Sequence, residues 1–279
     1  MPNDRQWAAA IAAETLHALE VGHYGLDGHR VTLAEAVQRS IAGTVTYPPE
    51  SLDLDPVATP AGGTVEVRGE TTLAATRRLA AAGHRVVALN FASGRSPGGG
   101  FLRGAIAQEE SLARSSALYP CLAGNPMYAA NRASGDPMYT DAVIYSPDVP
   151  VFRDDRGGWL HEPYRCGFLT CAAVNAGVVL QRTPPDGWAA ARSRIATAMR
   201  RRIAAVLAAG LRHGHDAIVL GAWGCGVFGN DPATVARLFA EALRGPFAGA
   251  YPLVVFSIFD PSARQPILHT FREALAGRP

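Results

Sequence analysis

Apolar positions recur at helical spacing near the start of the chain, which predicts an amphipathic helix over residues 3–20. Residues 24–60 are rich in turn formers and predict a short helix over 33–41 and little else. From residue 64 onward, apolar runs alternate with amphipathic segments. The predicted strands cover residues 64–68, 85–91, 142–152, 168–173, 217–223 and 251–259. The predicted helices cover residues 71–82, 108–118, 188–210, 232–244 and 262–276, with a loop from 119 to about 141.

This alternation of strands and helices predicts an α/β fold, in which helices cover both faces of one sheet. No linker, repeat or block of charge divides the sequence. We therefore expect one structural unit, with an N-terminal accessory segment at residues 1–63 and a core at residues 64–279.

Composition narrows the class of protein. Hydrophobic residues make up 48% of the chain and charged residues 18%, so the sequence can form a large core and is not expected to be disordered. The formal net charge of +2 is too small to suggest binding to DNA or to a membrane surface. All basic residues other than histidine are arginine, which excludes a catalytic lysine.

Targeting and metal signals are weak. The sequence has no apolar run near the roughly 18 residues of a membrane span, and acidic residues flank the only apolar stretch at its start. The four cysteines lack paired spacing, which favours buried thiols over a zinc site. We expect a cytoplasmic protein that needs no metal and no cofactor.

A run of three glycines, Gly98, Gly99 and Gly100, follows the strand predicted at 85–91. Such a run suits a loop whose backbone approaches a ligand closely, although a tight structural loop would also explain it. Gln108, Glu109 and Glu110 follow at the predicted start of a helix. Adjacent helical residues point about 100° apart, so the two glutamates cannot flank a bond from opposite sides. One is expected to transfer a proton while the other binds the substrate.

A second glycine-rich loop, GCGVFG, lies at residues 224–229 between a predicted strand and a predicted helix. The spacing is that of a dinucleotide-binding fingerprint, but too little chain follows for a complete doubly wound domain. The glycine-rich loop itself still predicts that backbone N–H groups at a helix N-terminus hold a diphosphate.

The two loops together resemble a known family. The stretch NFASGRSPGGGFLRGAIAQEESLARSSAL (residues 90–118) is similar to the signature of poly(ADP-ribose) glycohydrolases, and WGCGVFG (223–229) is similar to that family's second phosphate loop. The likeness is to the compact bacterial type, and it spans roughly residues 64–260. It implies a three-layer, macrodomain-like fold: a mixed, mostly parallel sheet with helices on both faces, after an N-terminal helical extension.

The resemblance also implies roles for individual residues. Glu110 would be the catalytic acid and Glu109 its ribose-binding partner, and Phe228 would orient the terminal ribose. Glu70 would contact the adenine amino group, and Ser93 stands where related proteins usually carry a ribose-binding asparagine. The remaining substrate-binding residues would be Asn90, Gly98, Gly99, Gly100, Gln108, Gly224, Gly226, Val227 and Gly229.

The expected reaction is hydrolysis of ribose–ribose O-glycosidic bonds in poly(ADP-ribose), which releases ADP-ribose. Partners would be the polymer and ADP-ribosylated proteins. One alternative is a non-catalytic macrodomain that only binds ADP-ribose, and another is a nicotinamide-dependent oxidoreductase. The arginines at 200–202 are either a solvated helix face or a track for the polymer.

Overall fold

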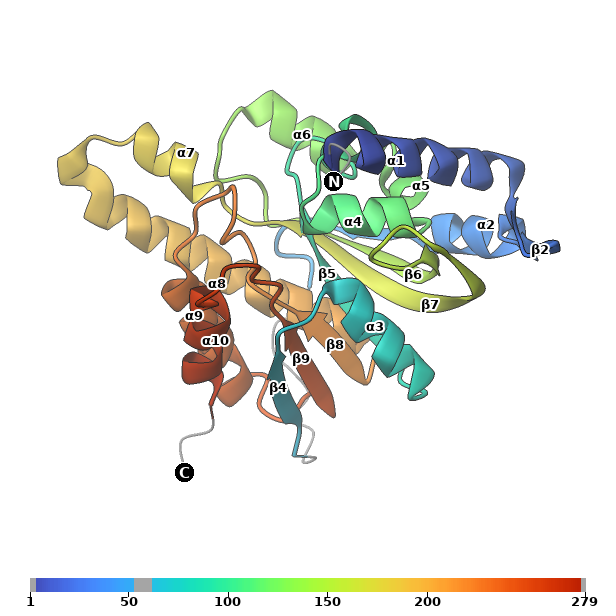
Figure 1. Ribbon diagram of the computed structural model, residues 1–279. Coiled ribbons are helices and arrows are strands. Elements are labelled where there is room, and N and C mark those ends of the chain that lie inside the picture. The colour runs from blue at the N-terminus through green and yellow to red at the C-terminus, as the bar shows by residue number, and fades with distance from the viewer. Residues whose placement is uncertain (1–3, 53–61, 277–279) are drawn as a thin grey trace.

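The computed structural model describes residues 4–52 and 62–276, and its centre is one large sheet (Figure 1). In the described part of the chain, seven strands form this sheet in the order β3-β6-β7-β5-β8-β9-β4. Their bounds are Val45–Tyr47 for β3, Thr64–Arg68 for β4, Val86–Ala92 for β5, Val143–Arg153 for β6, Trp159–Ala172 for β7, Ala217–Leu220 for β8 and Leu253–Ser257 for β9.

Strand direction decides where a site can form. Strand β5 runs parallel to both β7 and β8, and β9 runs parallel to both β8 and β4. Strand β6 is antiparallel to both of its neighbours, β7 and β3. The loops that follow β4, β5, β7, β8 and β9 therefore meet at one edge of the sheet, where open α/β folds bind ligands.

Helices cover both faces of the sheet, which gives three layers. Along β5, Val87 and Leu89 point into one core and Val86 and Ala88 into the other, as the two-residue period of a strand requires. On the first face lie α7 (Ala176–Gln181), α8 (Trp188–Arg212), α9 (Pro232–Arg244) and α10 (Pro266–Leu275). On the second lie α1 (Asp4–Val21), α2 (Ala34–Ala42), α3 (Thr72–Ala81), α4 (Gln108–Ser115), α5 (Leu118–Leu122) and α6 (Pro126–Ser134).

Several helices begin at a side chain that caps them. The side chain of Thr71 accepts a hydrogen bond from the backbone of Ala74 at the start of α3, and Asp231 does the same for Thr234 in α9. Asn125 caps α6 through the N–H of Met127. Pro126 and Pro232 occupy the first position of their helices, where a missing N–H costs nothing.

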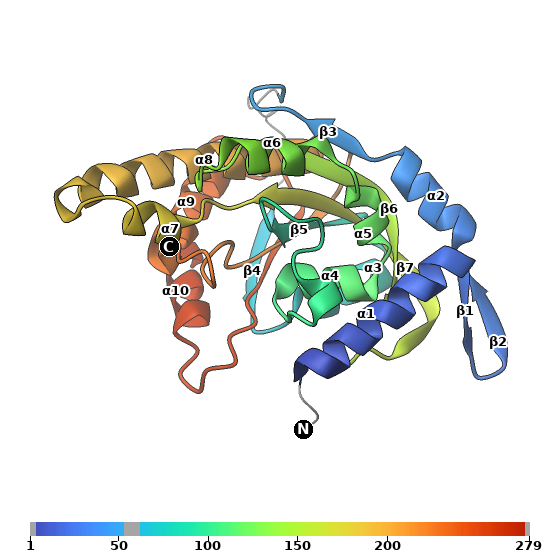
Figure 2. The same ribbon diagram turned by 90° about the horizontal axis from the view of Figure 1, so that it is seen from above.

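The N-terminal region contributes to the sheet and to the helix layer. Helix α1 crosses the molecule beside α4, as the view from above shows (Figure 2). A hairpin of β1 (His23–Leu26) and β2 (His29–Thr32) follows, then α2. Strand β3 pairs with β6 and forms one border of the main sheet. This segment is thus integrated with the rest of the described chain.

Most predicted elements are present, and the fold class is confirmed. The helix at 33–41 and every helix and strand predicted from residue 64 onward have a counterpart within a few residues, except that β7 begins at Trp159, well before residue 168. The region 24–60 was expected to hold little besides one helix, but it contains β1, β2 and β3. The predicted loop at 119–141 contains α5 and α6, and α7 was also missed. Residue 3 and the turn-rich stretch 53–60 lie outside the described residues.

Three of the four cysteines are buried, as the sequence suggests, whereas Cys225 is partly exposed. All four cysteines are free thiols, and Cys121, Cys166 and Cys171 are buried. Within residues 4–52 and 62–276, none of the helices has the length and apolar character needed to cross a membrane.

One buried arginine joins α1 to the β6–β7 hairpin. Arg153 is 1% exposed; it donates hydrogen bonds to Thr15, the carbonyl of Gly157 and Glu14, and its guanidinium lies 3.3 Å from the ring centre of Trp159. Its partner Glu14 is 56% exposed. The contribution of this arginine to stability should therefore come from its buried contacts more than from the ion pair.

We predict that Arg153→Met lowers the free energy of unfolding by about 2–4 kcal/mol, because several buried hydrogen bonds to a charged group are lost. Glu14→Gln should cost less than about 1 kcal/mol, as exposed ion pairs do. Urea denaturation of both variants measures the difference. Equal losses in the two variants would contradict this assignment.

Candidate active site

Two cavities open at the edge of the sheet where β5, β8 and β9 end. The first has a volume of about 480 Å³ and lies between the loops after β5 and β8 and the start of α4. We call it the carboxylate cavity, because Glu109 and Glu110 line it. The second has a volume of about 460 Å³ and lies between the start of α3 and the loop after β9; we call it the neighbouring cavity. Both are lined by Phe91, Gln108 and Gly226, so they form one cleft.

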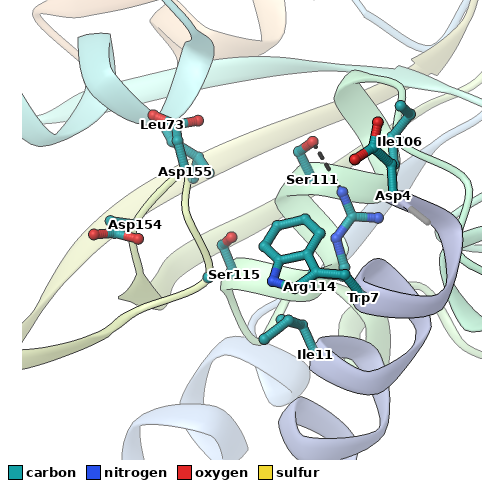
Figure 3. Close-up of a pocket in the computed structure, with 11 residues that line it drawn as sticks. Asp4, Trp7, Ile11, Leu73, Ile106, Ser111, Arg114, Ser115, Asp154 and Asp155 are labelled. Atoms are coloured by element: carbon teal, nitrogen blue, oxygen red, sulfur yellow. Dashed lines mark hydrogen bonds between the residues drawn. The ribbon is translucent and has the colours of Figure 1, made fainter. Parts of the chain in front are cut away.

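A third cavity of about 180 Å³ lies beyond the neighbouring cavity, beside α1 (Figure 3). Figure 3 shows Trp7 and Ile11 of α1 near Arg114, which donates a hydrogen bond to Ser111. Neither glutamate of the cleft lines this cavity. Among these three cavities, the paired glutamates line only the carboxylate cavity.

The first glycine-rich loop is shaped around the two glutamates. Gly98 and Gly99 have φ angles of +66° and +60°, in the left-handed region that favours glycine. A Cβ atom at Gly99 would lie 2.3 Å from Oε1 of Glu110 and 3.0 Å from Oε2 of Glu109. Any side chain at residue 99 would thus collide with the carboxylates. The loop is anchored below by Phe101, whose buried ring packs against Tyr119.

Gln108 fixes the start of α4 to the end of β5. Its amide oxygen accepts a hydrogen bond from the N–H of Phe91, and its Nε2 donates to the carbonyl of Leu89 and to the hydroxyl of Thr72. These hydrogen bonds hold Gln108 against β5 and thereby fix the positions of the next two residues of the helix, Glu109 and Glu110. It also lines both cavities, as expected for a residue beside the substrate.

Glu109 is held beneath the cleft by donors on β5 and the loop after it. Its Oε2 accepts from the N–H of Ser93 at 2.6 Å, and its Oε1 accepts from Nδ2 of Asn90 at 3.4 Å. The side chain is only 3% exposed. Burial raises the pKa of Glu109 to about 8, and the charge of Glu110 adds to the increase, against the opposing effect of the hydrogen bonds. Glu109 can therefore carry a proton near neutral pH.

Glu110 has one carboxylate oxygen bound and one available. Its Oε1 accepts from the N–H of Gly100 at 2.9 Å. Within the described part of the chain, its second oxygen has no hydrogen-bond partner, and the side chain lines the carboxylate cavity. Glu110 is thus better placed than Glu109 to exchange a proton with a ligand, because both oxygens of Glu109 accept bonds from the protein.

The second glycine-rich loop forms the opposite wall of the cleft. Gly224 has a φ of +74°, and a Cβ there would overlap Asn230 and Ala173. At Gly226, by contrast, a Cβ would meet no protein atom within 4 Å. Among the described residues, the N–H groups of Gly226, Val227 and Phe228 have no protein acceptor. They can bind an anion in the cleft.

The helix after this loop differs from the expectation. We expected its N-terminus to hold a diphosphate, but the carboxylate of Asp231 already accepts from the N–H of Thr234 there. A second anion would be repelled from that position. The free N–H groups of the loop itself are the remaining donors.

Phe228 also lines the carboxylate cavity. Its ring is partly buried and lies 5.9 Å from the ring of Tyr139, centre to centre. Its carbonyl accepts from the N–H of Gly177, which ties the loop to α7. Val227, next to it, is 93% exposed at the tip of the loop.

The remaining predicted residues differ in how close they lie to the cleft. Gly100, Gly224, Gly226, Val227 and Ser93 line the carboxylate cavity, and Gly98 and Gly229 support its two loops. Asn90 is completely buried and reaches the cleft only through Glu109. Glu70 does not line either cavity, and its carboxylate accepts a hydrogen bond from Arg78 at 2.6 Å.

Sequence reasoning missed several residues of the cleft. Ser96 and Arg103 line the carboxylate cavity, and Thr71, Asp155 and Phe259 line the neighbouring one. Asp155 comes from the turn between β6 and β7, where it accepts from the hydroxyl of Thr71 at 2.7 Å. No sequence motif marks that turn. Phe259 lies just after β9 and is 70% exposed. Its position at the end of a strand was the one signal in the sequence that could have predicted its place in the cleft.

The arginines of α8 do not form a free basic track. Arg200 pairs with Glu241 and Arg201 with Asp141, while Arg202 is buried and binds Asp141 and three backbone carbonyls. In the described ranges, no group of three or more His, Cys, Asp or Glu residues could hold a metal ion.

Comparison with known families and structures identifies similar proteins. The family model described as "Microbial-type PARG, catalytic domain" matches residues 12–154. No curated protein sequence matches the chain.

Solved structures are similar over almost the whole chain. The poly(ADP-ribose) glycohydrolase of Thermomonospora curvata is 47% identical, with a TM-score of 0.89, and the match covers 97% of this chain and 100% of that one. The same enzyme bound to the inhibitor ADP-HPD is 48% identical, with a TM-score of 0.88 and coverage of 96% and 99%. The Deinococcus radiodurans enzyme in complex with ADP-ribose is 42% identical, with a TM-score of 0.82 and coverage of 88% and 99%.

The pKa of Glu109 predicts how stability changes with pH. Folding raises this pKa from the ordinary value of 4.5 to about 8, so between these values the folded protein holds a proton that the unfolded chain releases. The stability that this proton contributes is complete below the lower value and is lost as the pH rises through the higher one. Glu109→Gln cannot lose a proton, and its Tm should increase relative to the wild type as the pH rises through this window.

Thermal denaturation at a series of pH values measures this effect, with Glu162→Gln as the control for an exposed glutamate. Parallel Tm profiles for the wild type and Glu109→Gln would show that the carboxyl of Glu109 titrates normally.

Proposed function

Since the chain belongs to the microbial-type poly(ADP-ribose) glycohydrolases, we propose that Glu110 and Glu109 divide the work of this hydrolysis between them. The protein is an enzyme that hydrolyses the ribose–ribose O-glycosidic bonds of poly(ADP-ribose) and releases ADP-ribose. The alternatives of a non-catalytic macrodomain and of a nicotinamide-dependent oxidoreductase are therefore wrong. The observation that carries the division of roles is the difference in hydrogen bonding between the two glutamates.

Glu110 is the proposed proton donor and acceptor. Glu110 lines the carboxylate cavity, and one of its oxygens has no hydrogen-bond partner in the described protein. It protonates the oxygen that leaves when the glycosidic bond breaks, and the resulting carboxylate then takes a proton from the attacking water. The N–H of Gly100 keeps the other oxygen in position through both steps.

Glu109 is the proposed ribose-binding partner. Its pKa of about 8 allows a neutral carboxyl at physiological pH, and a neutral carboxyl can donate a hydrogen bond to a ribose hydroxyl. A neutral Glu109 also adds no negative charge beside the carboxylate that Glu110 becomes once it has donated its proton. The phenyl ring of Phe228, which lines the same cavity, would pack against the ribose and hold it in the reactive orientation.

The diphosphate would bind between the two glycine-rich loops. The free N–H groups of Gly226, Val227 and Phe228 are suitable donors for phosphate oxygens, and the open space at Gly226 lets the ligand approach the backbone. Gly98, Gly99 and Gly100 would line the ribose and its phosphate from the other side. A negative diphosphate close to the reacting ribose would also stabilise the positive charge that develops on the sugar.

The adenine would then occupy the neighbouring cavity. The size of this cavity and the exposed ring of Phe259 that lines it suit a flat aromatic base. Glu70 directly precedes Thr71 of this cavity. One oxygen of its carboxylate binds Arg78, and the other would contact the adenine amino group.

We extend the proposal to partners and location. ADP-ribosylated proteins would present the polymer to the cleft. A cytoplasmic location agrees with four cysteines that are all free thiols.

We predict that Glu110→Gln lowers kcat for poly(ADP-ribose) hydrolysis by about 10²–10⁴-fold, because an amide keeps the shape of the side chain but cannot donate the proton. The Kd for ADP-ribose should stay within about tenfold, since most ligand contacts are unchanged. Chromatography of released ADP-ribose measures turnover, and calorimetric titration measures affinity.

Glu162→Gln, on the exposed part of β7, is the matched control and should keep normal turnover. Normal turnover in Glu110→Gln would refute its role as proton donor. If Glu109→Gln alone abolished turnover, the roles of the two glutamates would have to be exchanged.

A further inference from the structure

Three arginines from distant parts of the chain are linked through two backbone carbonyl groups. Arg95 lies in the loop after β5, Arg132 on α6 and Arg182 at the end of α7. Arg95 and Arg182 each donate to the carbonyl of Gly135 at 3.4 Å, and Arg132 donates to the carbonyl of Arg95 at 2.6 Å. We call these three residues the arginine cluster.

The positive charge of this cluster is not compensated by the protein. Within residues 4–52 and 62–276, none of the three arginines forms an ion pair, and all three are exposed. The arginines of α8 behave differently, because Arg200 and Arg201 each pair with a carboxylate. Like charges held close together repel one another, so such a cluster costs free energy unless an anion binds there.

The cluster adjoins the catalytic end of the cleft. Arg95 lies between Ser93, whose N–H binds Glu109, and Ser96; both serines line the carboxylate cavity. Gly94 packs closely against the ring of Tyr139, which in turn contacts Phe228. None of residues 93–96 lines the neighbouring cavity. The cluster therefore lies beside the carboxylate cavity, on the side away from the neighbouring cavity in which we propose that the adenine binds.

From this position we infer that the arginine cluster binds the diphosphate of the ADP-ribose unit on the leaving side of the cleaved bond. The inference rests on the proposed function, in which Glu110 acts on the bond between the unit in the cleft and the rest of the polymer. That remaining chain must leave the cleft next to Glu110, and its first unit carries its own diphosphate. Guanidinium groups bind phosphate oxygens through paired N–H donors, which suits them to this contact.

Arg103 is excluded from the cluster for a structural reason. It lines the carboxylate cavity itself, so a substitution there would also change the site of the bound unit. The cluster lies outside the residues that line the cleft. The three arginines can therefore be substituted without changing the cleft itself, and the Kd for free ADP-ribose shows whether the cleft is intact.

The test compares a triple variant, Arg95→Gln, Arg132→Gln and Arg182→Gln, with a control that removes the same charge elsewhere. The control is Arg77→Gln, Arg165→Gln and Arg272→Gln, three exposed arginines that form no ion pair in the described chain. Both proteins are assayed for kcat/KM on long poly(ADP-ribose) at low and high salt. The Kd for free ADP-ribose and the circular dichroism spectrum are measured for each.

The cluster variant should lose about tenfold or more in kcat/KM at low salt, mostly through KM, with its Kd for ADP-ribose changed less than about twofold. The loss should shrink at high salt, because screening weakens phosphate contacts in the wild type as well. The control variant should resemble the wild type. Equal kcat/KM in the cluster and control variants would overturn the inference, as would a parallel loss of ADP-ribose affinity. Failure of the wild type to hydrolyse the polymer would instead refute the proposed function.

Discussion

The site depends on the absence of a side chain at residue 99. Oxygen atoms of Glu109 and Glu110 approach the position that a Cβ of Gly99 would occupy, and the positive φ of this residue turns the loop toward them. Because the loop is this close, the N–H of Gly100 can bind one oxygen of Glu110. The close approach of the loop therefore couples its position to the positions of the two carboxylates.

The second requirement is a set of donors that permits a carboxyl group to be buried. Glu109 is almost fully buried, and its pKa is raised by that burial, yet Asn90 and the backbone of Ser93 supply hydrogen bonds that limit the cost. Both donors come from the end of β5, the central parallel strand, which Gln108 connects to the start of α4. The end of β5 thus fixes the position of the Glu109 carboxyl and affects its pKa. Glu110 has one oxygen without a partner in the described protein and remains free to react.

The sequence predicted the parts of the site that are local in the chain. The glycine run and the two glutamates lie within a short segment, and GCGVFG is equally compact, so their motifs carry the information directly. Asp155 and the arginine cluster could not be predicted, since the fold brings them from separate turns and helices to the cleft and its rim. Strands β1, β2 and β3 were missed because three or four residues are too few to show a two-residue period. Helix α6 did have signals, namely Asn125 and Pro126 at its start and Gly135 at its end.

The most direct test of this account compares two glycine-to-alanine variants with similar backbone strain. Gly99 has a φ of +60° and a Cβ position that overlaps Glu110, whereas Gly124 has a φ of +77° and no atom within 4 Å of its Cβ position. Each alanine should cost roughly 1–2 kcal/mol of stability through its left-handed conformation. The kcat for poly(ADP-ribose) hydrolysis should fall at least about 100-fold in Gly99→Ala, because the carboxylates are displaced, and should stay close to the wild-type value in Gly124→Ala. Equal kcat values in the two folded variants would contradict the claim that the missing side chain of Gly99 positions the catalytic pair.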